Sequence, residues 1–253
     1  VRAVPADAAR GFAVDPDDVA RRLTRRSRVL ILGCPAVPAG AVPDESALRR
    51  LAALATARDL VVVADELHEP FVHDGAVHRS IGALPGMAER TITINGFSTA
   101  YAMDGWRVGY AAGPARLLKP LQELKQALSI CSPAVSQYAA LAALTGPQTV
   151  LEEARRLVAE RRTVTLAALR RGGLPHVRPA GGYYVLVDGA ALGLKGAALA
   201  GRVAREAGVR LAAGSAFGAA TASWLRLSLT RPAEQLDEAV NRLGTVLGAR
   251  TLQ

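Results

Sequence analysis

Short apolar runs alternate with longer amphipathic stretches along most of the chain. Residues 29–32 and 60–64 are continuous apolar runs, which are typical of strands buried on both faces of a parallel sheet. Between them, residues 44–59 repeat leucine at helical spacing, so we expect a helix with one apolar face. This alternation predicts an α/β fold.

Further helices are predicted from their end signals and their apolar register. In residues 12–24, Asp15 can cap a helix whose first residue is Pro16. Residues 115–129 and 134–144 follow as helices, and residues 148–171 form a longer one that is closed by two glycines. From residue 174 onward the order is strand, strand, helix, strand, strand, helix, which predicts an α+β module. Its expected elements are residues 176–178, 183–187, 196–207, 209–212, 224–229 and 232–247.

Residues 91–94 and 108–112 are predicted to be two strands joined by a loop of small residues. Arg107 precedes the second strand and is flanked by Trp106 and Val108. An uncompensated charge in an apolar setting is costly. We therefore expect an anionic group to meet Arg107.

Residues 96–110 read G-F-S-T-A-Y-A-M-D-G-W-R-V-G-Y. This run resembles the pattern S-x-S-K-x-Y-x-x-x-G-W-R-x-G-Y of class I/II aminotransferases, the fold-type I enzymes that use pyridoxal phosphate. The lysine that forms the Schiff base in that family is Thr99 here, and the first serine, a phosphate ligand, is Gly96. Ser98 and Arg107 match the pattern and are implied to contact the cofactor. Threonine has no amine, so no catalytic residue is intact at position 99.

Two other motifs resemble cofactor-binding parts of the same family. Residues 65–68, D-E-L-H, match D-E-x-Y, which implies that Asp65 pairs with the pyridine nitrogen and that His68 replaces a tyrosine. Without the resemblance, Asp65 could equally be a helix N-cap. Residues 34–40, C-P-A-V-P-A-G, lie where the family reads N-x-P-x-N-P-x-G, whose second asparagine donates to the cofactor's phenolic oxygen. That residue is Val37 here.

Arg226 is the candidate substrate-binding residue. It alternates with Leu225 and Leu227 on a predicted strand and matches the arginine that binds the substrate's α-carboxylate in the family. An edge-strand arginine facing water is the alternative that the residues alone leave open.

The resemblance covers essentially the whole chain. It implies a partial fold-type I large domain, with a mostly parallel sheet and helices on both faces, over residues 1–146. A linking helix over residues 147–171 and a C-terminal α+β small domain over residues 172–253 follow. The family's N-terminal part has no counterpart before Val1. Because a sheet without its other strands leaves backbone groups unpaired, we expect a fragment, or a homodimer or partner chain that completes the sheet.

Composition excludes several classes of protein. The net charge of +9 comes from 31 Lys and Arg residues, of which only Lys119, Lys125 and Lys195 are lysines. The basic residues are scattered along helices, so we expect a solvated surface and no nucleic-acid partner. The absence of a long apolar run or signal segment and the low cysteine count predict a cytoplasmic protein with no membrane association.

His68, His73 and His78 recur every five residues. This spacing belongs to neither a helix nor a strand, so we expect no metal site.

Three functions remain open. Family resemblance implies a transaminase of amino and oxo acids that uses pyridoxal phosphate, but the losses at Thr99, Gly96 and Val37 predict weak or absent cofactor binding and a degenerate enzyme. The second possibility is a cofactor-independent enzyme with His68 or Asp65 as general base. The third is a catalytically silent subunit. In each case the expected small ligand is a carboxylate.

Overall fold

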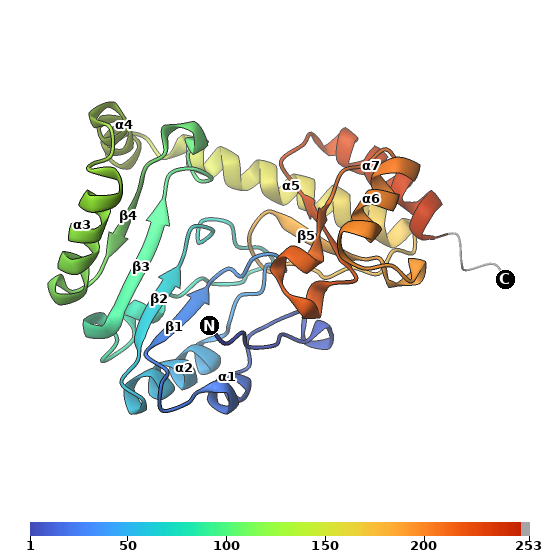
Figure 1. The fold of residues 1–253 in the computed structure, drawn as a ribbon. Coiled ribbons are helices and arrows are strands. Elements are labelled where there is room, and N and C mark those ends of the chain that lie inside the picture. Colours follow the sequence, from blue (N-terminus) through green and yellow to red (C-terminus); the bar gives the residue numbers. More distant parts are fainter. Residues whose placement is uncertain (249–253) are drawn as a thin grey trace. The chain divides into compact units, whose positions relative to one another are not determined.

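The computed structural model describes residues 1–248, which divide into two compact units (Figure 1). The first unit contains residues 1–4, 14–35 and 42–155, and the second contains residues 5–13, 36–41 and the chain from Arg156 onward. The division falls inside the long helix α5 (Thr149–Arg171). The boundaries expected at residues 146 and 171 stay a prediction.

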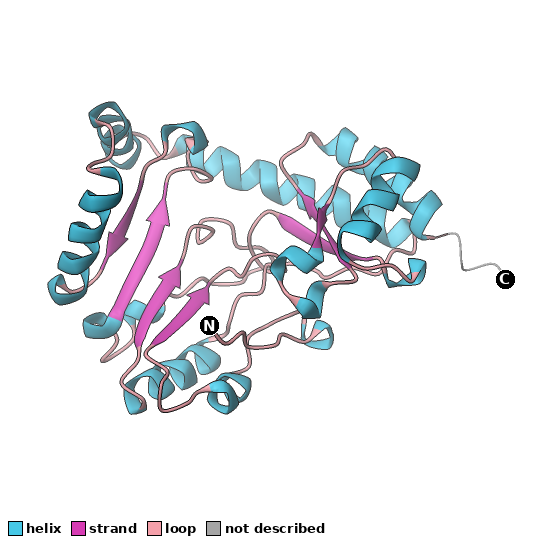
Figure 2. Ribbon diagram, viewed as in Figure 1, coloured by secondary structure: helices cyan, strands magenta, loops and turns pink. Residues whose placement is uncertain are grey.

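Four strands form the sheet of the first unit (Figure 2). They are β1 (Val29–Gly33), β2 (Val61–Asp65), β3 (Thr91–Gly96) and β4 (Gly109–Ala112), in that order across the sheet. The first three strands are parallel, and β4 runs antiparallel to β3. The predicted α/β architecture with a mostly parallel sheet is confirmed.

One face of this sheet is covered by α1 (Pro16–Arg22) and α2 (Glu45–Ala57). Asp15 accepts a hydrogen bond from the backbone N–H of Asp17 and Pro16 opens α1, as the sequence predicts. Leucines of α2 pack against β1 and β2 in a core that includes Val19, Leu48, Leu51, Val62 and Ala64. Burying each large apolar side chain contributes about 1.5–3 kcal/mol.

The opposite face of the sheet is exposed, which corrects the expectation that the strand at residues 29–32 is buried on both faces. Val29 is 52% exposed and Ile31 is 72% exposed. Side chains alternate between the two faces of a strand, so the buried Leu32 points to the α2 side while Ile31 points away from it. Partners in the register, such as Val63 beside Ile31, share the exposed face.

Helices α3 (Ala115–Ser129) and α4 (Ala134–Thr145) also leave apolar side chains exposed. No residue of α3 is buried, and α4 buries only Ser136 and Ala140. The exposed residues of this region are defined here as the α3–α4 apolar set: Leu121, Leu124, Leu128, Ile130, Val135, Tyr138, Leu141 and Leu144. No helix within residues 1–248 is long and apolar enough to cross a membrane.

The second unit holds a three-stranded antiparallel sheet with the order β5-β7-β6. Its elements after α5 are β5 (Tyr184–Asp188), α6 (Gly196–Glu206), β6 (Ala212–Ala213), β7 (Trp224–Ser228) and α7 (Ala233–Leu247). Helices α5, α6 and α7 pack their apolar faces on this sheet in one core. The strand expected at residues 176–178 is reduced to a single bridge between His176 and Val187.

Residues 36–41 are held within the second unit by a close backbone contact at Gly40. The N–H of Gly181 donates to the carbonyl of Gly40 at 2.8 Å. Gly40 has a φ of +71°, and a Cβ there would lie 2.3 Å from the carbonyl oxygen of Gly181. Only glycine fits this turn, so the glycine of the proline-rich motif has a structural role.

Candidate functional site

The turn between β3 and β4 carries Thr99. Phe97 and Met103 are buried on either side of it and contact Ala140 of α4. The hydroxyl of Tyr101 donates to Gln148 Oε1 at 2.9 Å, which ties the turn to the residues just before α5. Ser98 and Thr99 lie partly buried between these anchors. The turn therefore has a fixed backbone, with a hydroxyl where the resembled family has an amine.

Gly96 ends β3 in a space that is fitted to glycine. A Cβ at this position would lie 3.1 Å from Leu67 Cδ2 and 3.5 Å from the Cα of Gly109. The N–H of Gly96 donates to Asn95 Oδ1 at 2.8 Å, so the buried amide of Asn95 turns back on its own strand. A serine here would require Leu67 to move by a few tenths of an ångström.

Asp65 lies at the carboxyl end of β2 and is exposed. Its Oδ1 accepts a hydrogen bond from the N–H of Leu67 at 3.2 Å. A turn follows instead of a helix, so the helix-cap alternative is wrong and Asp65 caps a turn. Within residues 1–248 its carboxylate has no ion pair. His68 is buried in this same turn.

Arg107 is exposed, which corrects the expectation of an apolar setting around its charge. It has a left-handed backbone with a φ of +52°, directly after the 3-10 turn Asp104–Trp106. Its Nη1 donates to the carbonyl of Asp104 at 2.7 Å. Water and this carbonyl satisfy the guanidinium, so the fold does not require the anion that the sequence analysis expected.

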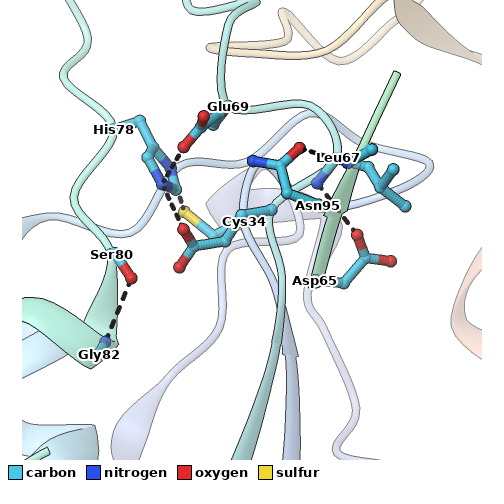
Figure 3. A network of polar contacts seen from close by, with 10 residues as sticks. Cys34, Asp65, Leu67, Glu69, His78, Ser80, Gly82 and Asn95 are labelled. Atoms are coloured by element: carbon cyan, nitrogen blue, oxygen red, sulfur yellow. Dashed lines mark hydrogen bonds and ion pairs between the residues drawn. The ribbon is translucent and has the colours of Figure 1, made fainter. Parts of the chain in front are cut away.

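A network of ionisable side chains around His78 is largely buried, with Glu66 and Cys34 at its inner side (Figure 3). His78 Nε2 is 3.2 Å from Glu66 Oε2 and 3.7 Å from Glu69 Oε2, and His78 Nδ1 is 3.4 Å from Cys34 Sγ. Burial by itself would lower the pKa of His78, but hydrogen bonds with Cys34 and Glu66 outweigh it and raise the pKa to about 10. His78 is therefore protonated at neutral pH.

Residue spacing does not predict this network. Cys34 and His78 are 44 positions apart, and the five-residue repeat of histidines carries no information about which side chains meet in space. The available signal was the position of Cys34 and Glu66 directly after neighbouring parallel strands, whose carboxyl ends meet at one edge of the sheet.

Arg226 occupies the middle of β7, the central strand of the second sheet, so the edge-strand alternative is wrong. Its guanidinium carbon lies 4.1 Å from the ring centre of Tyr184 and 4.6 Å from that of Phe217. Arg226 forms no ion pair within the described part of the chain. Burial, together with the hydrogen bond from the Tyr184 hydroxyl to that of Tyr183, raises the pKa of Tyr184 to about 12, although the charge of Arg226 opposes the shift. The guanidinium thus contacts two aromatic faces, an arrangement that is typical of cation–π interactions.

The described residues do not fit a covalently attached pyridoxal phosphate. Position 99 has no amine, Gly96 has no hydroxyl, and Val37 is 45% exposed with no side-chain donor. Lys119 and Lys125 are exposed on α3, and Lys195 is exposed just before α6. Asp65 and Arg107 remain as charged groups that could meet the cofactor, but an ionic contact cannot replace a covalent bond.

Comparison with known proteins identifies the family. The family model described as aminotransferase class I and II matches residues 1–243. An aspartate aminotransferase of Pyrococcus abyssi is 35% identical over 243 residues, and the arginine–pyruvate transaminase AruH of Pseudomonas aeruginosa is 39% identical over 241 residues. These matches cover 95% of this chain but only 62% and 61% of the relatives, so the chain spans about three fifths of their length.

Solved structures agree with this result. The aromatic aminotransferase from Pyrococcus horikoshii superposes with a TM-score of 0.94 at 35% identity, covering 99% of this chain and 68% of that protein. The aspartate aminotransferase of Thermus thermophilus with maleate gives a TM-score of 0.90, also at 35% identity, covering 96% of this chain and 63% of that protein. The predicted fold class and family resemblance are therefore confirmed, and the chain belongs to the class I and II aminotransferase family.

Proposed function

We propose that this protein is a catalytically silent member of its family, which binds small amino or oxo acids through Arg226 but does not transaminate them by itself. Thr99 is the observation that carries the proposal. A Schiff-base lysine both anchors the cofactor and moves a proton, and a threonine hydroxyl can do neither. The three lysines are exposed on other elements, so none is a ready substitute.

The losses at Gly96 and Val37 support the same proposal. Each removes a hydrogen bond that the family resemblance assigns to the cofactor, and a neutral hydrogen bond contributes about 0.5–1.5 kcal/mol. The tight space around Gly96 indicates that Leu67 has taken the room that a serine would need. Pyridoxal phosphate is therefore expected to bind weakly or not at all. The cofactor contacts that the family resemblance still implies are Asp65, His68, Ser98 and Arg107.

The carboxylate site is proposed to persist because the surroundings of Arg226 suit it. An arginine can bind a carboxylate with two parallel hydrogen bonds. The faces of Tyr184 and Phe217 limit the orientations of the guanidinium, and no acidic side chain among residues 1–248 competes for it. A small amino or oxo acid carries the required carboxylate.

A second chain is proposed to associate with this one, as a homodimer in the first instance. The α3–α4 apolar set, and Val29 and Ile31 on the sheet, are groups of exposed apolar side chains. Such groups indicate an interaction surface, whereas single exposed apolar residues do not. Both are expected to be covered when the protein functions.

Borohydride trapping tests the loss of covalent chemistry. The chain is mixed with pyridoxal phosphate, reduced, digested and examined by peptide mass spectrometry. We expect no stoichiometric pyridoxyl group on any lysine, and at most weak labelling in Thr99→Lys, because Gly96 and Val37 are unchanged. A stoichiometric adduct on Lys119, Lys125 or Lys195, together with oxo-acid formation from an amino acid, would show that the protein is an active transaminase.

A further inference from the structure

The network around His78 consists of side chains to which the family resemblance assigns no role, although Glu66 follows Asp65 directly and Cys34 lies in the motif that contains Val37. It joins the end of β1, the turn after β2 and the loop that leads toward β3, through Cys34, Glu66, Glu69 and His78. Figure 3 shows Cys34 and Glu69 turned toward the His78 ring, while Asp65 lies away from it. Glu66 and Cys34 are each only 3% exposed, so bulk water does not solvate the inner part of the network.

Two carboxylates meet one edge of a single imidazole in this network. Glu66 Oε2 lies 3.2 Å and Glu69 Oε2 lies 3.7 Å from His78 Nε2. No lysine or arginine within residues 1–248 forms an ion pair with either glutamate. A buried carboxylate such as Glu66 is costly unless it is paired or binds a metal. A divalent cation placed between the two carboxylates and Nε2 would contact all three side chains.

We propose that Glu66, Glu69 and His78 bind a divalent transition-metal ion of the zinc type. Their donor atoms all lie within 4.8 Å of one another. Zinc binds nitrogen and carboxylate oxygen at about 2.0–2.2 Å, and its tetrahedral geometry places two donors roughly 3.3–3.6 Å apart. The side chain of Glu69 is 41% exposed and can close the remaining gap by rotation. Two carboxylates and one imidazole are donors that Zn²⁺ accepts, and three protein ligands leave a position open.

Cys34 orients His78 in this site and is not a ligand. Its sulfur faces Nδ1, whereas both glutamates face Nε2 on the other edge of the ring. When a metal replaces the proton at Nε2, the Nδ1–H still donates to Cys34. That contact selects the tautomer in which Nε2 can bind a metal. Groups that accept the N–H of the other ring nitrogen commonly orient histidine ligands in this way. The ion would connect residues 66 and 69 to residue 78 and so restrain the loop between them.

Zinc and cobalt titrations of the metal-free chain test the site. The parent is the Cys131→Ser variant without a histidine tag, because the exposed Cys131 thiol could bind either metal by itself. Zn²⁺ is titrated by calorimetry at mildly alkaline pH, where protons compete less for Nε2, and Co²⁺ is followed by absorption. Glu69→Gln removes one ligand at a half-exposed position. Glu123→Gln is the matched control because Glu123 is exposed on α3 and forms no ion pair with any other described residue.

We expect one Zn²⁺ per chain, a dissociation constant at least about tenfold larger in Glu69→Gln, and no change in Glu123→Gln. Cys34→Ser should keep one Zn²⁺ per chain, and the Co²⁺ spectrum of the parent should lack a sulfur-to-cobalt charge-transfer band. The proposal is overturned if the parent binds no Zn²⁺, or if Glu69→Gln binds it as tightly as the parent. A sulfur-to-cobalt band would overturn the ligand assignment by showing Cys34 on the metal.

Discussion

The surroundings of Arg226 could be predicted only in part from the sequence. Alternation with leucines indicates a strand, but the central position of β7 and the two aromatic faces depend on residues about 10 and 40 positions away. The family resemblance, not the pattern of apolar residues, implied that Arg226 binds a carboxylate, and that role stays a prediction.

Replacing Arg226 should weaken carboxylate binding. Hydrogen bonds to charged groups contribute about 1.5–3 kcal/mol, so Arg226→Ala should lower the affinity for an amino or oxo acid by roughly 10- to 150-fold. Isothermal titration calorimetry measures this change. Arg231→Ala is the control, since Arg231 is exposed, lies five positions away in the sequence and forms no ion pair within residues 1–248. Equal affinity of the two variants would remove Arg226 from the binding site.

His78 should make the stability of the metal-free chain depend on pH. Its folded-state pKa of about 10 lies above the ordinary value of 6.5, so the stabilisation is fully present below about 6.5 and is lost as pH rises through about 10. Urea unfolding with a chelator present should show a stability loss between pH 7 and 10 that is smaller in Glu66→Gln than in the parent chain. The same slope in both proteins would show that the Glu66 contact does not hold the proton.

At the level of elements, residue pattern predicts where helices and strands lie but not how many of their faces are covered. The helix predicted at residues 115–129 is α3 with the same ends, and Asp15 and Pro16 begin α1 as expected. The strand at residues 29–32 is correct in position, yet one of its faces is exposed. A continuous apolar run indicates a strand that is packed on both faces, but the run does not say which other segment packs against each face.

The difference between a helix packed against the sheet and an exposed helix can be measured as the effect of one leucine-to-alanine substitution in each on the free energy of unfolding. Leu51 of α2 is fully buried, so Leu51→Ala should reduce the free energy of unfolding by about 2–5 kcal/mol. Leu124 of α3 is 56% exposed, so Leu124→Ala should change it by roughly 0.5 kcal/mol or less in dilute, monomeric protein. Chemical denaturation of both variants provides the comparison. A large cost at Leu124 in the monomer would mean that α3 is covered by its own chain.

For the molecule as a whole, family membership was predictable from sequence because the motif around Thr99 keeps its neighbours even though the lysine has gone. How the chain associates with other chains is harder to predict from sequence. In the sequence, the α3–α4 apolar set belongs to two ordinary amphipathic helices, and the apolar stripes of such helices normally pack inside the same chain. Its exposure emerges only when the positions of all other described elements are known.

Self-association is expected to cover this set. On α3, Leu121, Leu124 and Leu128 follow helical spacing and form an apolar stripe that a second copy can bury. Each chain has a net charge of +9, so repulsion opposes association at low salt and weakens as salt screens it. Analytical ultracentrifugation should therefore show a dimer that becomes more stable as salt concentration increases.

A charge placed within the stripe should separate assembly from folding. Leu124→Asp buries a carboxylate in the proposed interface, which is costly without a partner, while the monomer loses little because the site is exposed. Gln122→Asp adds the same charge to the same helix outside the stripe and is the matched control. The expected result is loss of the dimer only in Leu124→Asp, with similar unfolding free energies for both variants under monomeric conditions. A parent chain that stays monomeric at every concentration and salt level would exclude a second copy as the cover of the α3–α4 apolar set.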